Sequence, residues 1–209
     1  MQPTQIIQPQ EEFVKLVQAM AARPNASADV VQLAADIVNG TKKLVPETIY
    51  VRFILGGKSQ VDFFDPSQGQ NRQVGVYKLD SGKLPNGMFF MPISVQIQAV
   101  VKAVLVENDL KSLNYGGIGA LADGSLRNAE LDLTVDSFPI LKDFALLNFE
   151  TANNANVRTG EYYLPTRRLF EPQREIRGSI KAPAGLVFLA NLAGEVALHG
   201  IATSVVKSN

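Results

Sequence analysis

Few side chains in this 209-residue sequence belong to the types that most often carry out catalysis or bind metals. The sequence has no cysteine, no tryptophan and a single histidine, His199. Without cysteine there are no disulfides, no thiolate nucleophile and no cysteine-bound zinc. One histidine cannot make a histidine-rich metal site, and no G-x-S-x-G sequence supports a serine nucleophile. We therefore predict that the chain is not an enzyme, has no catalytic residues and needs no metal or cofactor. His199 is expected to be a structural or exposed residue.

Two glycine-containing segments match nucleotide-binding motifs only in part. Gly117-Ile-Gly119-Ala-Leu-Ala122 fits G-x-G-x-x-A, but polar residues 108–112 precede it and Asp123-Gly124 follows it. The dinucleotide fingerprint requires a strand before the glycines and a helix after them. Gly57-Lys58-Ser59 follows an apolar run, but Arg52 stands where a phosphate-binding loop needs glycine. We interpret the first segment as a flexible loop and the second as a hairpin turn.

Carboxylates are the remaining candidates for chemistry, because paired acids can hydrolyse glycosidic bonds and acidic clusters can bind calcium. Glu130, Asp132 and Asp136 lie within residues 129–136, where polar and apolar residues alternate. Such alternation is typical of a half-buried strand, so we interpret these acids as its solvent-facing side. An enzyme that uses only carboxylates stays a third hypothesis, and no EF-hand spacing supports a calcium site.

The charge balance argues against a nucleic-acid partner. Lysine and arginine number 20 and aspartate and glutamate also number 20, so the formal net charge is zero. A protein that neutralises many phosphates is strongly basic. The first residues lack the basic and apolar blocks of a signal peptide. The apolar stretch 88–106 is too interrupted for a membrane span. We expect synthesis in the cytoplasm without export by a signal peptide.

Residues 1–46 are predicted to form an N-terminal arm with two short helices. Pro3 and Pro9 favour an extended tail over the first nine residues. Apolar residues then recur at helical spacing: Phe13, Leu16, Val17 and Met20. Pro24 ends this helix. Each helix is about three turns long and marginal alone in water, so it must pack against the rest of the chain or a neighbouring subunit.

The second helix of the arm has a clear start signal. Ser27 is a good N-cap, and Gly40 stands where a helix commonly ends. One face is expected to hold the apolar residues Val30, Val31, Ala34, Ile37 and Val38.

Residues 47–209 are predicted to form one mainly β domain, an antiparallel β-sandwich or jelly roll of about eight strands. Short β-branched and aromatic runs alternate with glycine- and proline-rich turns, and no βαβ alternation is visible. The expected strands are 48–55, 61–64, 74–79, 129–136, 174–181, 187–192 and 194–206. Stretch 88–106 accommodates two strands or one strand bent near Pro92. Segment 140–149 fits either a short helix or a crossing segment.

The charges are unevenly distributed along the chain. Acidic residues outnumber basic ones in segment 107–150, whereas basic residues outnumber acidic ones in segment 157–181. One interpretation is intramolecular pairing or plain solvated faces. The other is a pair of complementary edges that steer copies of the chain together. On the second interpretation the candidate subunit-interface residues are Arg158, Arg167, Arg168, Arg174 and Arg177, together with the arm anchors Phe13, Leu16, Val17 and Met20.

After a strand and an Asn/Gln-rich loop, five segments give the chain a characteristic order of strands and turns. They are Leu84-Pro-Asn-Gly-Met-Phe-Phe90 leading into 93–97, Gly124-Ser-Leu126 leading into 130–135, Leu164-Pro-Thr166, 175–185, and the closing Val196-Ala-Leu-His-Gly200. Over residues 48–205 this order resembles the coat proteins of tailless, icosahedral, often membrane-containing bacteriophages. The resemblance implies a jelly roll whose strands stand roughly upright in a capsid.

The resemblance also implies a structural function. We expect a capsid subunit in a virion, made in the host cytoplasm, that self-assembles through its sandwich flanks and an N-terminal helical tether. Its expected partners are copies of itself in a trimer or ring, other virion proteins and, peripherally, an internal membrane, with no specific nucleic acid. Deletion of residues 1–46 is expected to leave a soluble sandwich that no longer assembles correctly.

The alternative function is a carbohydrate- or receptor-binding jelly roll of the spike or lectin type. Sugar sites commonly use an exposed aromatic platform. The candidates for such a platform are Tyr115, Tyr162 and Tyr163.

Overall fold

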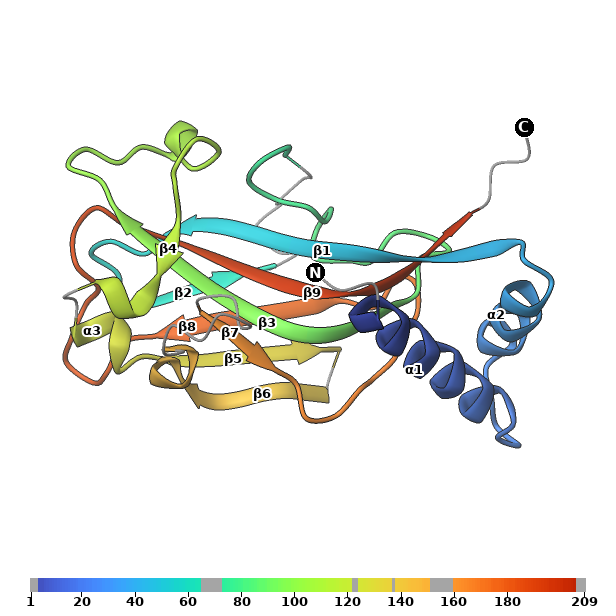
Figure 1. The fold of residues 1–209 in the computed structure, drawn as a ribbon. Coiled ribbons are helices and arrows are strands. Elements are labelled where there is room, and N and C mark those ends of the chain that lie inside the picture. Colours follow the sequence, from blue (N-terminus) through green and yellow to red (C-terminus); the bar gives the residue numbers. More distant parts are fainter. Residues whose placement is uncertain (1–3, 65–72, 122–123, 137, 151–159, 206–209) are drawn as a thin grey trace.

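The computed structural model describes residues 4–64, 73–121, 124–136, 138–150 and 160–205. Within these residues the chain is a β-sandwich with two helices at its N-terminus (Figure 1). Nine strands form two antiparallel sheets, which confirms the predicted mainly β sandwich.

The first sheet contains the longest strands. Its order is β1-β9-β3-β4, and β7 also pairs with β3. The bounds are Lys42–Ile54 (β1), Leu192–Val205 (β9), Phe90–Val101 (β3), Gly116–Gly117 (β4) and Glu161–Tyr163 (β7). β1 pairs with β9 along its whole length, and β3 has a bulge between Pro92 and Ser94. Stretch 88–106 therefore holds one strand that is irregular near Pro92, and not two.

The second sheet has the order β2-β8-β5-β6. The bounds are Gln60–Phe63 (β2), Ile176–Lys181 (β8), Glu130–Val135 (β5) and Phe138–Ala145 (β6). In β5, Leu131, Leu133 and Val135 are buried while the residues between them are not. The predicted alternation of this strand is thereby confirmed. Segment 140–149 is divided between two elements: its first part belongs to β6, and Leu146–Phe149 is a short 3-10 helix.

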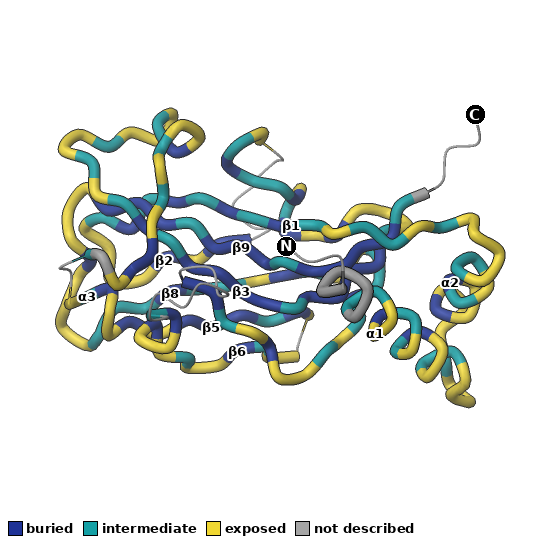
Figure 2. The backbone as a smooth tube through the Cα atoms, viewed as in Figure 1, coloured by how far each residue is buried: buried dark blue, intermediate teal, exposed yellow. Residues whose placement is uncertain are grey.

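The main core lies between the two sheets, where alternate residues of each strand are buried (Figure 2). Phe53 of β1 stacks on Phe63 of β2, with ring centres 5.1 Å apart. Gly178 of β8 is the register partner of Phe63. A Cβ atom at Gly178 would lie 2.1 Å from the Phe63 ring, so only glycine fits beside this stack. Burial of these apolar surfaces supplies the main driving force for the sandwich.

The strand pairs are nested along the sequence. β5 pairs with β6, β3 with β7, β2 with β8 and β1 with β9. This is the pattern of one long antiparallel hairpin whose tip is the β5–β6 connection. The pairs β3–β9 and β5–β8 then join neighbouring layers of the hairpin into two sheets.

The helices α1 (Thr4–Ala21) and α2 (Ala28–Val38) cover one end of the first sheet on its outer side (Figure 1). Phe13, Val17, Val30 and Leu33 form a second apolar cluster with Phe89, Met91 and Ile201. Ser27 caps α2, because its Oγ accepts a hydrogen bond from the Val30 amide at 3.3 Å. The predicted cap is thereby confirmed. A third helix, α3, is a single turn at Gly124–Arg127.

Two boundaries in the N-terminal part differ from the prediction. α1 begins at Thr4 and contains Pro9, so the extended tail predicted over residues 4–9 is wrong. Pro9 deprives only the Gln5 carbonyl of its helical donor, a loss that the rest of an 18-residue helix outweighs. β1 begins at Lys42 and includes Pro46, so the domain boundary predicted at residue 46 falls inside a strand. Proline is tolerated there because β1 is an edge strand.

Two predicted strands are absent from the described residues. Residues 74–79 form turns with isolated bridges such as Val51–Tyr77, since Gly75 has a φ of +83° that interrupts an extended run. Residues 187–191 form a loop, because Phe188 exchanges backbone hydrogen bonds with Gly57 and Lys58. The G-x-G-x-x-A segment begins at Gly117, the second residue of the two-residue β4, and continues as a short 3-10 helix at Ile118–Ala120. No long helix follows the glycines within the described residues, and residues 122–123 lie outside them.

Candidate subunit interface

The four predicted anchors of the arm divide into two pairs. Phe13 and Val17 are fully buried within their own chain, in the cluster with Met91 and Ile201. They are therefore not available on the surface of this fold, contrary to their assignment as interface anchors. The reason is that β3 and β9 present apolar residues outward at this end and already cover them. Leu16 and Met20 pack against the same cluster but are only partly buried, so part of their surface stays accessible.

Leu16 and Met20 line a groove of about 560 Å³. Three segments far apart in the sequence form it: the C-terminal half of α1, the β5–β6 connection and segment 166–174. The lining residues are Leu16, Met20, Arg23, Val135, Asp136, Phe138, Ile140, Thr166, Arg167, Arg168, Leu169, Phe170, Glu171 and Arg174. Five of the nine predicted interface residues thus meet at one place, which we call the arginine groove.

Arg167 builds one wall of the arginine groove. Its guanidinium Nη1 donates to the Ile93 carbonyl at 3.2 Å and to the Leu164 carbonyl, and its Nε lies 3.3 Å from a Glu12 carboxylate oxygen. The side chain therefore joins α1, β3 and the segment after β7. Arg167 is half-buried and committed to these contacts, so its role is to position the wall.

Arg174 fixes the opposite side of the arginine groove. Its Nη1 donates to Asp136 at 2.9 Å, and Asp136 also accepts from the Glu175 amide at 3.1 Å. These bonds hold the β5–β6 connection, where Asp136 has a φ of +50°. Glu171 accepts from the Ser27 hydroxyl at 3.2 Å, which links the start of α2 to the same segment.

Arg168 and Phe138 form the exposed part of the arginine groove. The Arg168 guanidinium lies over the Phe138 ring at 5.9 Å from its centre, a cation–π contact. Phe138 is 65% exposed although it is a large apolar residue. Arg167 and Arg174 have carboxylate partners, but among the described residues Arg23 and Arg168 have none. The arginine groove therefore combines an apolar lining with an excess of positive charge.

The two remaining predicted arginines do not line the arginine groove. Arg177 is exposed on β8, where its Nε donates to Glu175. It belongs to a different surface of the second sheet, beside Asp132 and Thr134. Arg158 lies outside the described residues.

Phe138 and Ile140, which the sequence analysis did not select, join the site because the β5–β6 connection turns them toward α1. The only signal in the sequence that could have selected them is that each is an apolar residue next to Pro139.

His199 lies in a polar row on the outer side of the first sheet. Its Nδ1 is 3.0 Å from the Thr48 hydroxyl and its Nε2 is 3.0 Å from the Gln96 amide oxygen. Beside them, the Ser94 hydroxyl donates to Glu161 at 2.5 Å. These bonds join β1, β9, β3 and β7, so His199 has the structural place expected of it. Within the described ranges, no group of three or more His, Asp or Glu side chains could hold a metal ion.

The three tyrosines proposed as a sugar platform are dispersed. Tyr162 packs against Phe144, with ring centres 4.6 Å apart. Tyr115 stacks under the Arg52 guanidinium at 5.0 Å, and burial raises the pKa of its hydroxyl to about 12 despite the nearby Arg52 charge. Only Tyr163 of the three is exposed.

Comparisons with known proteins identify no relative: no family model, no curated protein and no solved structure matches the chain. Among the described residues, no helix has both the length and the apolar character needed to cross a membrane. Function is therefore argued from residues and geometry.

Proposed function

We propose that this chain is a structural subunit that assembles with copies of itself into the shell of a virus. The observation that carries the proposal is the strand order. With the two-residue β4 set aside, the sheets are β1-β9-β3-β7 and β2-β8-β5-β6, folded from one nested hairpin. We interpret this order as that of an eight-stranded jelly roll, an architecture used by viral capsid proteins, lectins and cupins.

The residues favour the capsid class among these three. A cupin-type metal site relies on several histidines, and the one histidine of this chain is bonded to Thr48 and Gln96. A lectin-type site relies on an exposed aromatic platform, and the loop tyrosines do not form one here. A fold alone does not define a function, so the side chains distinguish between these classes.

The loops that follow β3 and precede β9 lie at the end of the sandwich opposite the helices (Figure 1), and their exposed apolar side chains also favour self-association. The exposed aliphatic side chains there are Val101, Val104, Val106, Leu186, Val187 and Leu189. The two loops that carry them are neighbours, because Asn191 hydrogen-bonds the backbone of Lys102 and Ala103. Contiguous apolar patches on soluble proteins commonly mark contact surfaces. We call this surface the end patch.

The proposal includes the setting in which such a subunit works. We propose a trimer or ring that tiles further, in contact with other virion proteins and located in the virion after synthesis in the host cytoplasm. Peripheral contact of the N-terminal helices with an internal membrane belongs to the same proposal. The zero net charge favours packing of like chains, since it removes long-range repulsion between copies.

Electron microscopy of the purified protein tests the proposal. The chain is concentrated without partners and imaged in negative stain. Shells, sheets or regular rings support a building block of a capsid. Isolated particles of single-chain size at every concentration contradict it. If those isolated particles also bind on a glycan array, the lectin-type alternative takes its place.

A further inference from the structure

Two arginines at the mouth of the arginine groove have unused hydrogen-bond donors. The Arg23 guanidinium makes no hydrogen bond or ion pair with any described residue. The Arg168 guanidinium lies over the Phe138 ring and has no other partner among the described residues. A guanidinium that stacks on an aromatic ring keeps N–H groups in its own plane with which it can bind an anion. Both arginines are exposed, so the mouth of the groove presents donors without acceptors.

The interior of the arginine groove is apolar. Val135 and Phe170 are only 6% and 4% exposed, so they form its floor. Leu16 and Met20 of α1 and Ile140 of β6 are partly buried and form its walls. The volume of about 560 Å³ lies within the range of roughly 300–1,000 Å³ that is usual for small-ligand clefts. An aliphatic chain placed along this floor leaves water, which favours its binding.

The charge of the lining favours an anion as the ligand. Four arginines and two acidic residues line the groove. Both acids lie beside Arg174: its guanidinium is 2.9 Å from an Asp136 oxygen and 3.8 Å from a Glu171 oxygen. No carboxylate among the described residues neutralises Arg23 or Arg168 in the same way. The mouth of the groove therefore attracts an anionic group and repels a cationic one.

We infer that the arginine groove binds one molecule of an aliphatic anion, an acyl chain that ends in a carboxylate or a phosphate. The chain lies along the apolar floor, and the head accepts charged hydrogen bonds from Arg23 or Arg168 at the mouth. Because the site is concave, it encloses a single chain, whereas the flat surface of a bilayer would reach only its rim. The inference goes beyond the proposed self-assembly and does not depend on it.

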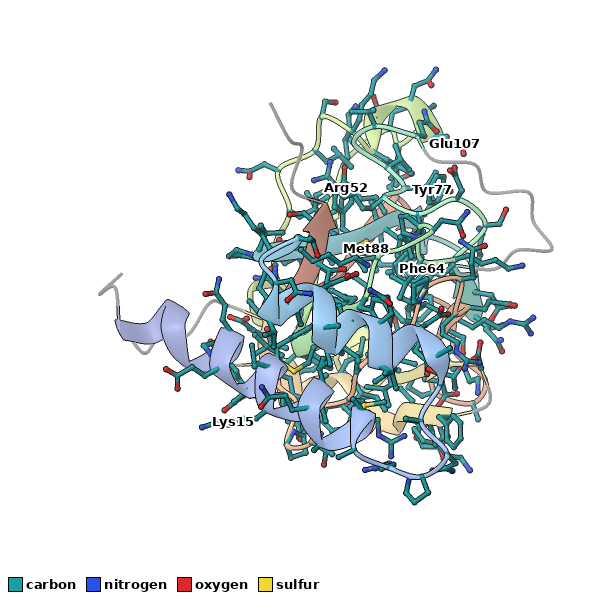
Figure 3. The ribbon with its side chains drawn as sticks, turned by 90° about the vertical axis from the view of Figure 1, so that its right-hand side faces the viewer. Lys15, Arg52, Phe64, Tyr77, Met88 and Glu107 are labelled. Atoms are coloured by element: carbon teal, nitrogen blue, oxygen red, sulfur yellow. The ribbon has the colours of Figure 1, made fainter. Side chains whose placement is uncertain are left out.

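A chain bound in the groove joins the helical arm to the sandwich. α1 and α2 lie together at the end of the molecule that faces the viewer in Figure 3, where Lys15 marks α1. α1 forms one wall of the groove, and the β5–β6 connection and segment 166–174 form the others. A ligand there touches three segments that come together only in the folded chain, so its binding also raises the stability of the fold.

Isothermal titration calorimetry with dodecanoate tests the inference, because this fatty acid is monomeric at titration concentrations. Octanoate has the same head and a shorter chain, and dodecyltrimethylammonium has the same chain and the opposite charge. The test variant combines Arg23→Gln with Arg168→Gln, which removes both unneutralised charges. The control variant is Arg177→Gln, at an exposed arginine of β8 outside the groove. These arginines are all exposed, and circular dichroism establishes that both variants are folded.

We expect one dodecanoate to bind per chain, and octanoate and dodecyltrimethylammonium to bind at least about tenfold more weakly. The double variant should bind dodecanoate at least about tenfold more weakly than the unchanged chain, and R177Q should bind it equally well. Carbon-13 labelling of the methionine methyl groups locates the ligand. The Met20 signal should shift on binding, whereas the Met88 signal should not, because Met88 packs against the main core.

Three results overturn the inference: no saturable binding of dodecanoate, equal binding of the two amphiphiles of opposite charge, or an unmoved Met20 signal. Flotation with phosphatidylglycerol vesicles distinguishes a single molecule from a bilayer as the source of the anion. A chain that binds the vesicles but not dodecanoate uses its arginines at a bilayer surface, which also overturns the inference. These measurements do not require assembly, so their failure leaves the proposed function standing.

Discussion

At the scale of single residues, the two sheets can approach each other closely because Gly178 has no side chain. Gly178 leaves room for the Phe63 ring, which in turn stacks in parallel on Phe53 with an angle of 4° between the rings. A methyl group at Gly178 would displace Phe63 and separate this stack. The identity of one small residue therefore controls how the second sheet meets the first.

We predict that Gly178→Ala lowers the free energy of unfolding by about 1–3 kcal/mol, the usual cost of overpacking a core. Chemical denaturation followed by circular dichroism measures this change. Gly116→Ala is the matched control, because a Cβ atom there meets nothing within 4 Å. Equal stability of the two variants would show that the Phe53–Phe63 stack is not as tight as described.

Asp132 makes stability depend on pH. Burial alone would raise the pKa of its carboxyl, but hydrogen bonds from Lys181 Nζ at 2.6 Å and the Asp143 amide at 2.8 Å lower it below the ordinary value. A carboxyl whose pKa is lower in the folded state stabilises the protein above its unfolded pKa of about 3.9. That contribution is lost as the pH falls from there through the folded pKa.

We predict that Asp132→Asn makes stability fall less steeply with pH below about pH 4. The expected change is less than about 1 kcal/mol, because the pair is partly exposed and solvent screens it. Urea unfolding midpoints at pH 7, 4 and 3 measure the slope. Lys181→Met removes the donor and is expected to flatten the slope in the same direction. An unchanged slope in both variants would mean that this pair does not contribute to the acid sensitivity.

At the scale of elements, one arginine holds two loops against the first sheet. Arg52 of β1 lies 2.5 Å from Glu195 of β9 and donates to the Gly75 carbonyl at 2.8 Å. Its guanidinium also lies between the Tyr50 and Tyr115 rings. The segments around residues 75 and 115 have few strand contacts of their own, so this side chain fixes their position on the sheet.

We predict that Arg52→Gln releases both loops and lowers the free energy of unfolding by about 1.5–3 kcal/mol, because Glu195 loses a charged hydrogen-bond partner. Hydrogen exchange should then accelerate at residues 73–78 and 110–115 and remain slow in β5 and β8. Lys78→Gln, which removes a partly exposed ion pair with Glu47, is the control. Unchanged exchange in the two loops would contradict the role given to Arg52.

The helical arm is also an element that protects a sheet face. Phe89, Met91 and Ile201 are buried beneath α1 and α2. The sequence alone suggested that removal of residues 1–46 leaves a soluble sandwich. The structure leads to a different expectation, because this deletion removes the first five residues of β1 and uncovers an apolar face.

We predict that deletion of residues 1–40, which keeps β1 whole, lowers solubility and promotes aggregation. The fraction of protein left in the supernatant after centrifugation measures this effect. Adding Met91→Thr and Ile201→Thr to the truncated chain should restore solubility, since threonine suits an exposed strand. A fully soluble truncated chain without these substitutions would show that the arm does not protect the sheet.

The sequence predicts elements well where the signal is local. The alternation in β5 and the Ser27 cap of α2 are fixed by neighbouring residues, and both have the predicted form. Segment 74–79 has strand-like residues, yet it forms turns because it pairs with the edge of β1 only at isolated bridges. Whether such a segment becomes a strand depends on pairing partners that are distant in the sequence, and a local pattern does not reveal them.

At the scale of the whole molecule, the nested hairpin brings distant segments into one site. The sequence analysis selected the arginine-rich segment from its charge, and Leu16 and Met20 from their helical spacing. Their meeting with Phe138 and Ile140 was not predictable, since it depends on where the β5–β6 tip lies relative to α1. The burial of Phe13 and Val17 was not predictable either, because the residues of β3 and β9 that cover them are far from α1 in the sequence.

Self-assembly is the central claim of this account, and the mass of the purified chain in solution tests it most directly. Sedimentation velocity over a hundredfold range of protein concentration measures that mass without a partner or a label. We predict that the average mass rises from the 22.7 kDa of one chain to a defined multiple of it as the concentration increases. A mass that stays at 22.7 kDa over the whole range would contradict the claim.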